Sequence, residues 1–219
     1  VWVDAVICDY NYVFDPKVRL KRFFSEQAVH QEYLFLVDEA HNLIERGRTM
    51  FSASISLQDV ELAAGYLKAL PQAFAGQAYH AVLGMERAMQ DYQTECREVM
   101  EEEHRKYLTM SSCNDVCFSM LRFLASMEEM LEEHTDFEGV EELMQFYFTV
   151  HHFVDMYENL DEHYVIYVEP LGYDHIELHL FCVNPSHCLQ EVLEKGRSTI
   201  LFSATMLPIA YYKELLTGN

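Results

Sequence analysis

Near the start of this chain, an apolar run of four residues ends abruptly in two adjacent carboxylates. Leu34-Phe35-Leu36-Val37 has the length of a strand, and Asp38-Glu39 follows it directly. An uninterrupted apolar run of this length predicts a parallel strand covered on both faces, and the functional groups of such sheets gather at the carboxyl ends of their strands. We therefore expect an α/β sheet with Asp38 and Glu39 at its carboxyl edge.

Two adjacent carboxylates can fill two different roles in nucleotide hydrolysis. One can hold Mg²⁺ through its water shell, while the other orients or deprotonates the attacking water. Asp38 suits the first role and Glu39 the second. The alternative is that both are ordinary acidic residues at the start of a helix, where the helix dipole favours negative charge.

A second strand-like run lies far downstream and has the same plan. Thr199-Ile200-Leu201-Phe202 runs into the small residues Ser203-Ala204-Thr205. This again places small polar side chains at the carboxyl end of an apolar strand.

Together, Asp-Glu-Ala-His at residues 38–41 and Ser-Ala-Thr at 203–205 resemble the motif II and motif III pair of superfamily 2 helicases. The resemblance extends into the flanks, because residues 4–16 and 178–185 are similar to the corresponding segments of the XPD and DinG helicases. The similar segments cover roughly half of the chain, at its two ends. The long segment between them is where the XPD family carries a helical Arch domain.

This resemblance implies an ATP-dependent DNA helicase that requires Mg²⁺ and acts on single-stranded and forked DNA, commonly moving from 5′ to 3′. Asp38 would hold the metal ion and Glu39 would activate water. His41 would connect the state of the nucleotide to Ser203, Ala204 and Thr205. The implied fold is an incomplete RecA-like (P-loop NTPase) parallel sheet interrupted by an all-α, Arch-like bundle.

The predicted organisation has three segments. Residues 1–52 would form the first part of a RecA-like domain, residues 53–160 the helical Arch-like domain, and residues 161–219 the second part of the RecA-like domain. Strands are expected at 4–8, at 34–37 and at the apolar run that precedes Ser203, with a strand pair at 164–169 and 176–183. Helices are expected at 190–194 and from 209 to 216.

The chain contains no Gly-x-x-x-x-Gly-Lys-Ser/Thr sequence, so it offers no phosphate-cradling loop of that type. It also begins with Val1 and not with methionine. We expect a piece of a longer enzyme that is inactive by itself. The alternative from a different class is a non-catalytic helical module, binding DNA or protein, on an inert α/β stub.

Between the two motif regions, apolar residues recur in alternating steps of three and four, which predicts helices with one apolar seam each. Four such helices most economically pack as a bundle. The stripes are Val60, Ala63, Leu67 and Leu70, ending at Pro71; Ala78, Val82, Met85, Met89, Tyr92, Cys96 and Val99; Cys117, Met120, Leu124, Met127 and Leu131; and Val140, Leu143, Tyr147, Val150, Val154 and Tyr157.

The predicted bundle is strongly acidic. Residues 53–160 hold 20 Asp and Glu against 6 Lys and Arg, in a chain whose net charge is −21. Binding of a phosphate backbone depends chiefly on Lys and Arg. Its acidic runs are therefore expected to be solvated faces, or a surface for a basic protein partner.

One compact basic stretch stands beside aromatic residues, which is the combination that grips single strands without sequence preference. The alternative is that the aromatic rings pack beneath a loop while the cations extend into water. The candidate nucleic-acid contacts are Tyr10, Tyr12, Lys17, Arg19 and Arg22.

The six cysteines are scattered, and they lack the short spacings of an iron–sulfur site. We therefore expect no cluster in this chain. The family resemblance would place any cluster upstream of Val1. No apolar run reaches the ~20 residues needed to span a bilayer, and the start does not resemble a secretory leader. The expected location is intracellular, in the cytoplasm at the nucleoid if the source is bacterial, without membrane partners.

Overall fold

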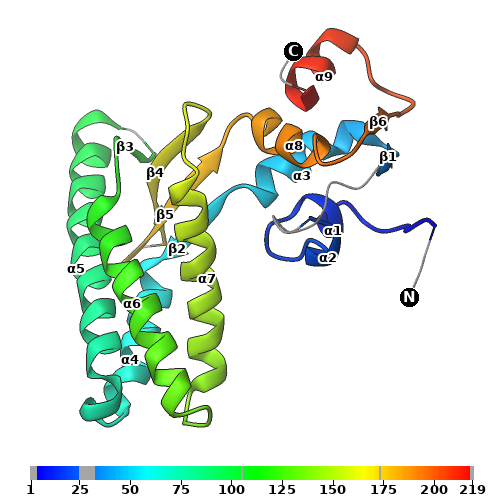
Figure 1. The fold of residues 1–219 in the computed structure, drawn as a ribbon. Helices are drawn as coiled ribbons and strands as arrows, with labels where there is room; N and C mark the ends of the chain where they lie inside the picture. The colour runs from blue at the N-terminus through cyan, green and yellow to red at the C-terminus, as the bar shows by residue number, and fades with distance from the viewer. Residues whose placement is uncertain (1–3, 25–32, 105, 173, 218–219) are drawn as a thin grey trace. The chain divides into compact units, whose positions relative to one another are not determined.

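The computed structural model describes residues 4–24, 33–104, 106–172 and 174–217. The chain divides into two compact units, shown in Figure 1. Unit 1 consists of Val1–Ser52 with Cys182–Asn219, and unit 2 is Ala53–Phe181. The structure is mixed α/β, with a two-stranded parallel sheet and a four-stranded antiparallel sheet.

Unit 1 is built around the parallel pair β1 and β6. Leu34 lies opposite Ser198, and Val37 lies opposite Leu201. In chain order its elements are α1 (Asn11–Phe14), α2 (Lys21–Phe24), β1 (Leu34–Val37), the 3₁₀ helix η1 (Ala40–Asn42), α3 (Leu43–Met50), α8 (Ser186–Leu193), β6 (Ser198–Leu201) and α9 (Ile209–Thr217).

Helix α3 follows the strand end and packs against α1, α8 and α9. It approaches α8 closely at Gly47, where an added Cβ would lie only 2.9 Å from the Cβ of Pro185. Leu43 and Ile44 of α3 are buried, as is Leu189 of α8. This packing fixes the start of α3, and with it the turn that joins α3 to β1.

Two sequence predictions for unit 1 are wrong. Residues 4–8 form no strand, and Ile7 is fully exposed. A strand requires a hydrogen-bonded neighbour, and among the described residues β1 pairs only with β6. Strand β1 is also not covered on both faces, because the side chains of Leu34 and Leu36 are 69% and 70% exposed.

Unit 2 combines helices with the antiparallel sheet, whose strand order is β2-β5-β4-β3. Its elements are β2 (Ala53–Ser56), α4 (Leu57–Ala69), α5 (Gln72–Glu103), β3 (Leu108–Met110), α6 (Asn114–Glu133), α7 (Val140–Glu158), β4 (Tyr164–Leu171) and β5 (His175–Cys182).

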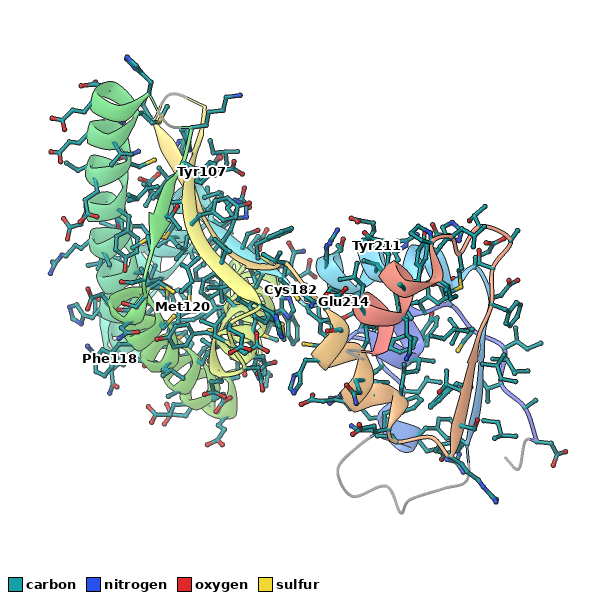
Figure 2. All side chains as sticks on the ribbon, turned by 90° about the horizontal axis from the view of Figure 1, so that it is seen from above. Tyr107, Phe118, Met120, Cys182, Tyr211 and Glu214 are labelled. Atoms are coloured by element: carbon teal, nitrogen blue, oxygen red, sulfur yellow. The ribbon has the colours of Figure 1, made fainter. Side chains whose placement is uncertain are left out.

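The four predicted helices are confirmed as α4 to α7, and most residues of the apolar stripes are buried in their shared core, whereas Tyr147 and Tyr157 of the fourth stripe are only partly buried. Helix α4 packs on α5 and α7, and α6 packs between α5 and α7. In Figure 2, Met120 of α6 lies within the bundle, whereas Phe118 lies at its outer side. The side chain of Met120 is fully buried, and that of Phe118 is 65% exposed.

Local chemistry sets several of the helix boundaries. The hydroxyl of Ser56 accepts a hydrogen bond from the backbone N–H of Asp59 at 3.1 Å and so caps α4. Helix α4 ends before Pro71, because proline cannot continue a helix interior. Helix α7 begins after Gly139, whose φ of +82° is a left-handed conformation that glycine adopts without strain.

The prediction of an all-α insertion is wrong, because a sheet is part of the same unit. The hairpin of β4 and β5, assigned from the sequence to residues 161–219 of the RecA-like domain, belongs to unit 2. Strand β5 pairs with β2, and β4 pairs with β3. The unit therefore extends to Phe181 and not to residue 160. Strands β2 and β3 were not predicted.

One face of the four-stranded sheet packs on the helices, chiefly on α4, α5 and α7. Val168, Ile176, Leu178 and Leu180 point into this core and are buried. The intervening residues of β4 and β5 lie on the opposite face, as the two-residue period of a strand requires. This second face is polar and partly exposed.

The predicted acidic runs lie at the surface of unit 2. Every described side chain among them is exposed: Glu101, Glu102, Glu128, Glu129, Glu132, Glu133, Glu141 and Glu142. Among the described helices, none combines the length and the apolar character that crossing a bilayer would require.

The two phenylalanines of α6 allow a matched test of this packing. Phe123 is fully buried and stacks edge-on against Phe146 with ring centroids 5.2 Å apart, whereas Phe118 is 65% exposed. We predict that Phe123→Ala lowers the free energy of unfolding by about 3–5 kcal/mol. Phe118→Ala should change it by less than about 1 kcal/mol. Urea denaturation followed by circular dichroism measures both, and equal losses would contradict the assigned core.

Candidate functional site

Backbone hydrogen bonds continue the pairing of β1 and β6 beyond the strand ends. The N–H of Phe202 donates to the carbonyl of Val37 at 3.0 Å, and the N–H of Ala40 donates to the carbonyl of Phe202 at 3.1 Å. These two bonds hold the Asp-Glu-Ala-His turn directly beside the residues that follow β6. The two predicted motifs are therefore adjacent in space.

The turn itself contains an unusual backbone conformation. Glu39 has φ 48° and ψ 41°, the left-handed region that non-glycine residues rarely adopt. Such a conformation costs about 1–3 kcal/mol and persists only when its surroundings impose it. Part of that restraint is local, because the Asp38 Oδ1 atom accepts a hydrogen bond from the Glu39 N–H at 2.7 Å. Complete burial of Ala40 adds to it.

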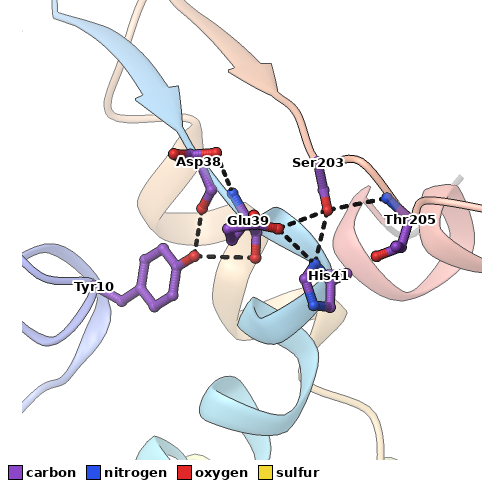
Figure 3. A network of polar contacts seen from close by, with 6 residues as sticks. All are labelled: Tyr10, Asp38, Glu39, His41, Ser203 and Thr205. Atoms are coloured by element: carbon purple, nitrogen blue, oxygen red, sulfur yellow. Dashed lines mark hydrogen bonds and ion pairs between the residues drawn. The ribbon is translucent and has the colours of Figure 1, made fainter.

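Tyr10 supplies a further restraint from a distant part of the sequence. Its hydroxyl contacts the carbonyl oxygens of both Asp38 and Glu39, the latter at 3.0 Å (Figure 3). Burial, and then the nearby carboxylates of Asp38 and Glu39, raise the pKa of Tyr10 above its ordinary value. The phenol therefore remains protonated at neutral pH and can act as a hydrogen-bond donor.

Ser203 joins the two strand ends through its side chain (Figure 3). Its hydroxyl donates to Glu39 Oε2 at 2.9 Å and lies 2.7 Å from His41 Nδ1. The backbone N–H of Thr205 donates to the same hydroxyl oxygen at 3.3 Å. His41 Nδ1 also lies 3.2 Å from Glu39 Oε2. One serine thus contacts the carboxylate and the imidazole of the turn together.

The hydrogen-bond inventory of this cluster assigns the proton on His41. A hydroxyl has one hydrogen to donate and two lone pairs. Ser203 uses its hydrogen on Glu39 and one lone pair on the Thr205 N–H. It therefore accepts from His41, so the Nδ1 atom of His41 carries a hydrogen.

The carboxylates remain open to solution. Asp38 is exposed, and the Glu39 side chain is 53% exposed. Among the described residues, no hydrogen bond reaches the second carboxylate oxygen of Asp38. This donor set suits Mg²⁺, which binds through one or two carboxylates and keeps several waters. The arrangement can hold a hydrated cation beside a second carboxylate that accepts protons.

The structure separates the five predicted nucleic-acid contacts. Tyr10 directs its hydroxyl to the turn, whereas Tyr12 of α1 is 47% exposed. Lys17 and Arg22 are exposed, and Arg19 is half-buried. A DNA role for these residues stays a prediction. The anchoring role of Tyr10 has no local sequence signature, because residues 10 and 38 are brought together only by the tertiary fold.

Two of the cysteines form a close buried pair. The sulfur atoms of Cys113 and Cys117 on α6 lie 3.7 Å apart. The hydrogen bond from this pairing, together with burial, raises the pKa of the Cys117 thiol. A thiol held in its protonated form is a poor metal ligand, because metals bind the thiolate.

Tyr10 and Tyr12 offer a matched pair for testing the anchor. Tyr10→Phe removes the hydroxyl that contacts the turn and leaves the ring, whereas the Tyr12 hydroxyl makes no hydrogen bond with the described residues. We predict that Tyr10→Phe lowers the free energy of unfolding of unit 1 by about 0.5–1.5 kcal/mol and speeds amide hydrogen exchange at residues 39–42. Tyr12→Phe should do neither. Unchanged exchange in Tyr10→Phe would refute the anchoring role.

Comparison with known proteins gives one family match. Residues 2–60 match the DEAD_2 family model, a domain of XPD/DinG-type helicases. No curated protein matches the chain. The matched segment includes Tyr10 and the whole Asp-Glu-Ala-His turn, but it does not reach β6 or Ser203. This DEAD_2 segment is therefore similar to the corresponding domain of XPD/DinG-type helicases and supports a fragment of a helicase.

Proposed function

We propose that this chain is the part of an ATP-dependent DNA helicase that carries the water-activating and coupling groups. At the family level, the DEAD_2 match indicates a helicase or ATPase-type enzyme. The observation that carries the finer proposal is the contact of Ser203 with both Glu39 and His41 at the ends of two paired parallel strands. We further propose that β1 and β6 belong to a RecA-like sheet.

Asp38 is proposed to hold the Mg²⁺ of a bound ATP, because its carboxylate is exposed and lies at the end of β1. Bound Mg²⁺ would neutralise charge on the phosphate oxygens. Glu39 is proposed to orient and deprotonate the attacking water, since its side chain is partly exposed and next to Asp38. The left-handed backbone of Glu39 helps to give the two adjacent carboxylates their separate directions.

His41 and Ser203 are proposed to couple the nucleotide state to motion of the segment after β6. When Glu39 turns toward water, its hydrogen bond with Ser203 has to be exchanged for another. The Ser203 hydroxyl also contacts His41 and the backbone of Thr205, so this exchange changes the hydrogen bonding of residues 203–205. Such a contact transmits a conformational change and performs no chemistry itself.

The proposed substrate is single-stranded and forked DNA, with movement from 5′ to 3′ as the family resemblance implies. Exposed Lys17 and Arg22 beside exposed Tyr12 support a local contact with a single strand in unit 1. The exposed carboxylates of unit 2 disfavour a phosphate backbone and favour a basic protein partner on that surface.

Replacement of the proposed base tests the catalytic role. In the full-length helicase that contains this chain, Glu39→Gln should retain ATP binding while lowering the rate of ATP hydrolysis by roughly 10²–10⁴-fold. Glu191→Gln, which changes an exposed glutamate of α8, is the control and should leave both unchanged. DNA-stimulated phosphate release and nucleotide binding are measured side by side. Full retention of hydrolysis in Glu39→Gln would favour the non-catalytic alternative.

A second substitution separates coupling from chemistry. Ser203→Ala removes all three contacts of the hydroxyl, whereas the Thr205 side chain makes no hydrogen bond with the described residues. We predict that Ser203→Ala keeps most of the DNA-stimulated ATPase activity of the full-length enzyme but loses strand separation. Thr205→Val should keep both. A parallel fall of ATPase and unwinding in Ser203→Ala, with a lower melting temperature, would show a structural role instead.

A further inference from the structure

A second cluster of titratable side chains lies outside the proposed nucleotide site, on the polar face of the sheet in unit 2. Glu177 and His179 are two residues apart on β5 and therefore share a face. Glu169 on the neighbouring strand β4 reaches the same place. One nitrogen and two carboxylate oxygens of these residues all lie within 4.8 Å of one another.

The two distances from the histidine nitrogen are those expected between ligands around one ion. His179 Nε2 lies 3.0 Å from Glu169 Oε1 and 3.6 Å from Glu177 Oε2. Ligands held about 2.0–2.2 Å from a zinc ion stand roughly 2.8–3.6 Å apart in tetrahedral or octahedral geometry. The cluster therefore needs little movement to place its three donor atoms on one cation.

The orientation of the histidine favours a metal ion shared by the three side chains over a simple ion pair. His179 Nε2 is buried and makes no hydrogen bond, even though a carboxylate oxygen is only 3.0 Å away. An imidazolium in an ordinary ion pair would direct its N–H at that oxygen. Metal ligands point at the ion and not at each other, so close contact with poor hydrogen-bond alignment is the expected arrangement.

A neighbouring ring holds the histidine in place, and the negative charge of the two carboxylates is only partly balanced. The ring of Tyr167 stacks on His179 with centroids 4.5 Å apart and planes inclined by only 9°. Within the described part of the chain, the ion pairs of Glu169 and Glu177 are those with His179. Two carboxylates therefore share one imidazole, in a unit whose charge is already strongly negative.

We propose that Glu169, Glu177 and His179 form a binding site for a divalent transition-metal ion of the Zn²⁺ class. Imidazole nitrogen with carboxylate oxygen is a donor set that zinc accepts, and three protein ligands leave a position for water. The ligand side chains are 45%, 26% and 17% exposed, so solvent reaches the site. The ion would tie β4 to β5 and stabilise the folded sheet.

Zinc titration of the whole 219-residue chain tests this site. Isothermal titration calorimetry should show a Zn²⁺ site whose affinity falls at least tenfold in Glu169→Gln and in Glu177→Gln. Both substitutions preserve shape and remove the charged ligand. The matched control is His151→Asn, which removes a histidine that lies 3.0 Å from Asp155. Among the described residues, His151 and Asp155 belong to no group of three possible metal ligands. It should leave the affinity unchanged.

Nuclear magnetic resonance distinguishes this site from zinc bound by the cysteines, which all of these variants retain. One equivalent of Zn²⁺ should shift the ring signals of His179 but not those of His151, and it should raise the melting temperature of the wild-type chain but not of Glu177→Gln. The proposal fails if neither glutamate substitution weakens binding, or if the His179 signals do not respond. In either outcome the cluster is only an ion pair.

Discussion

The parallel pairing of β1 with β6 is the interaction on which the candidate site depends. It brings together residues 39 and 203, which are 164 positions apart in the sequence. The two hydrogen bonds through Phe202 carry this pairing past the strands and into the turn. The position of every side chain in the cluster follows from that register, because a shift of one residue would turn Ser203 to the other face.

The sequence predicts those parts of the fold that are determined by patterns of residues close together in the chain. Helices α4 to α7 follow from the spacing of their apolar residues, and Asp38, Glu39 and Ser203 follow from strands that end in polar residues. Strands β2 and β3 have only four and three residues, too short for a recognisable alternation. Their pairing with β5 and β4 is non-local, so the hairpin was assigned to the wrong unit. The exposed face of β1 was missed for a related reason, because composition does not reveal which neighbours cover a strand.

Among the described residues, two of the places where histidine meets carboxylate differ in whether a hydroxyl joins the two groups. At the Asp-Glu-Ala-His turn, Ser203 stands between Glu39 and His41 and satisfies a ring nitrogen. On the sheet of unit 2, His179 meets Glu169 and Glu177 with no hydrogen bond at its Nε2 atom. The first arrangement is suited to exchanging hydrogen bonds, whereas the second is suited to sharing a cation.

The antiparallel pairing of β2 with β5 also affects the order in which the chain can fold. Ala53 lies opposite Leu180, and the Cys182 N–H donates to the Ser52 hydroxyl, so the two ends of the inserted unit are neighbours. During synthesis, β1 emerges from the ribosome long before its partner β6. Folding of unit 2 in the interval would shorten the loop that β1 and β6 must close and lower its entropic cost by roughly 1–2 kcal/mol. Folding of unit 2 would then bring the two sequence segments of unit 1 close together before β1 and β6 pair.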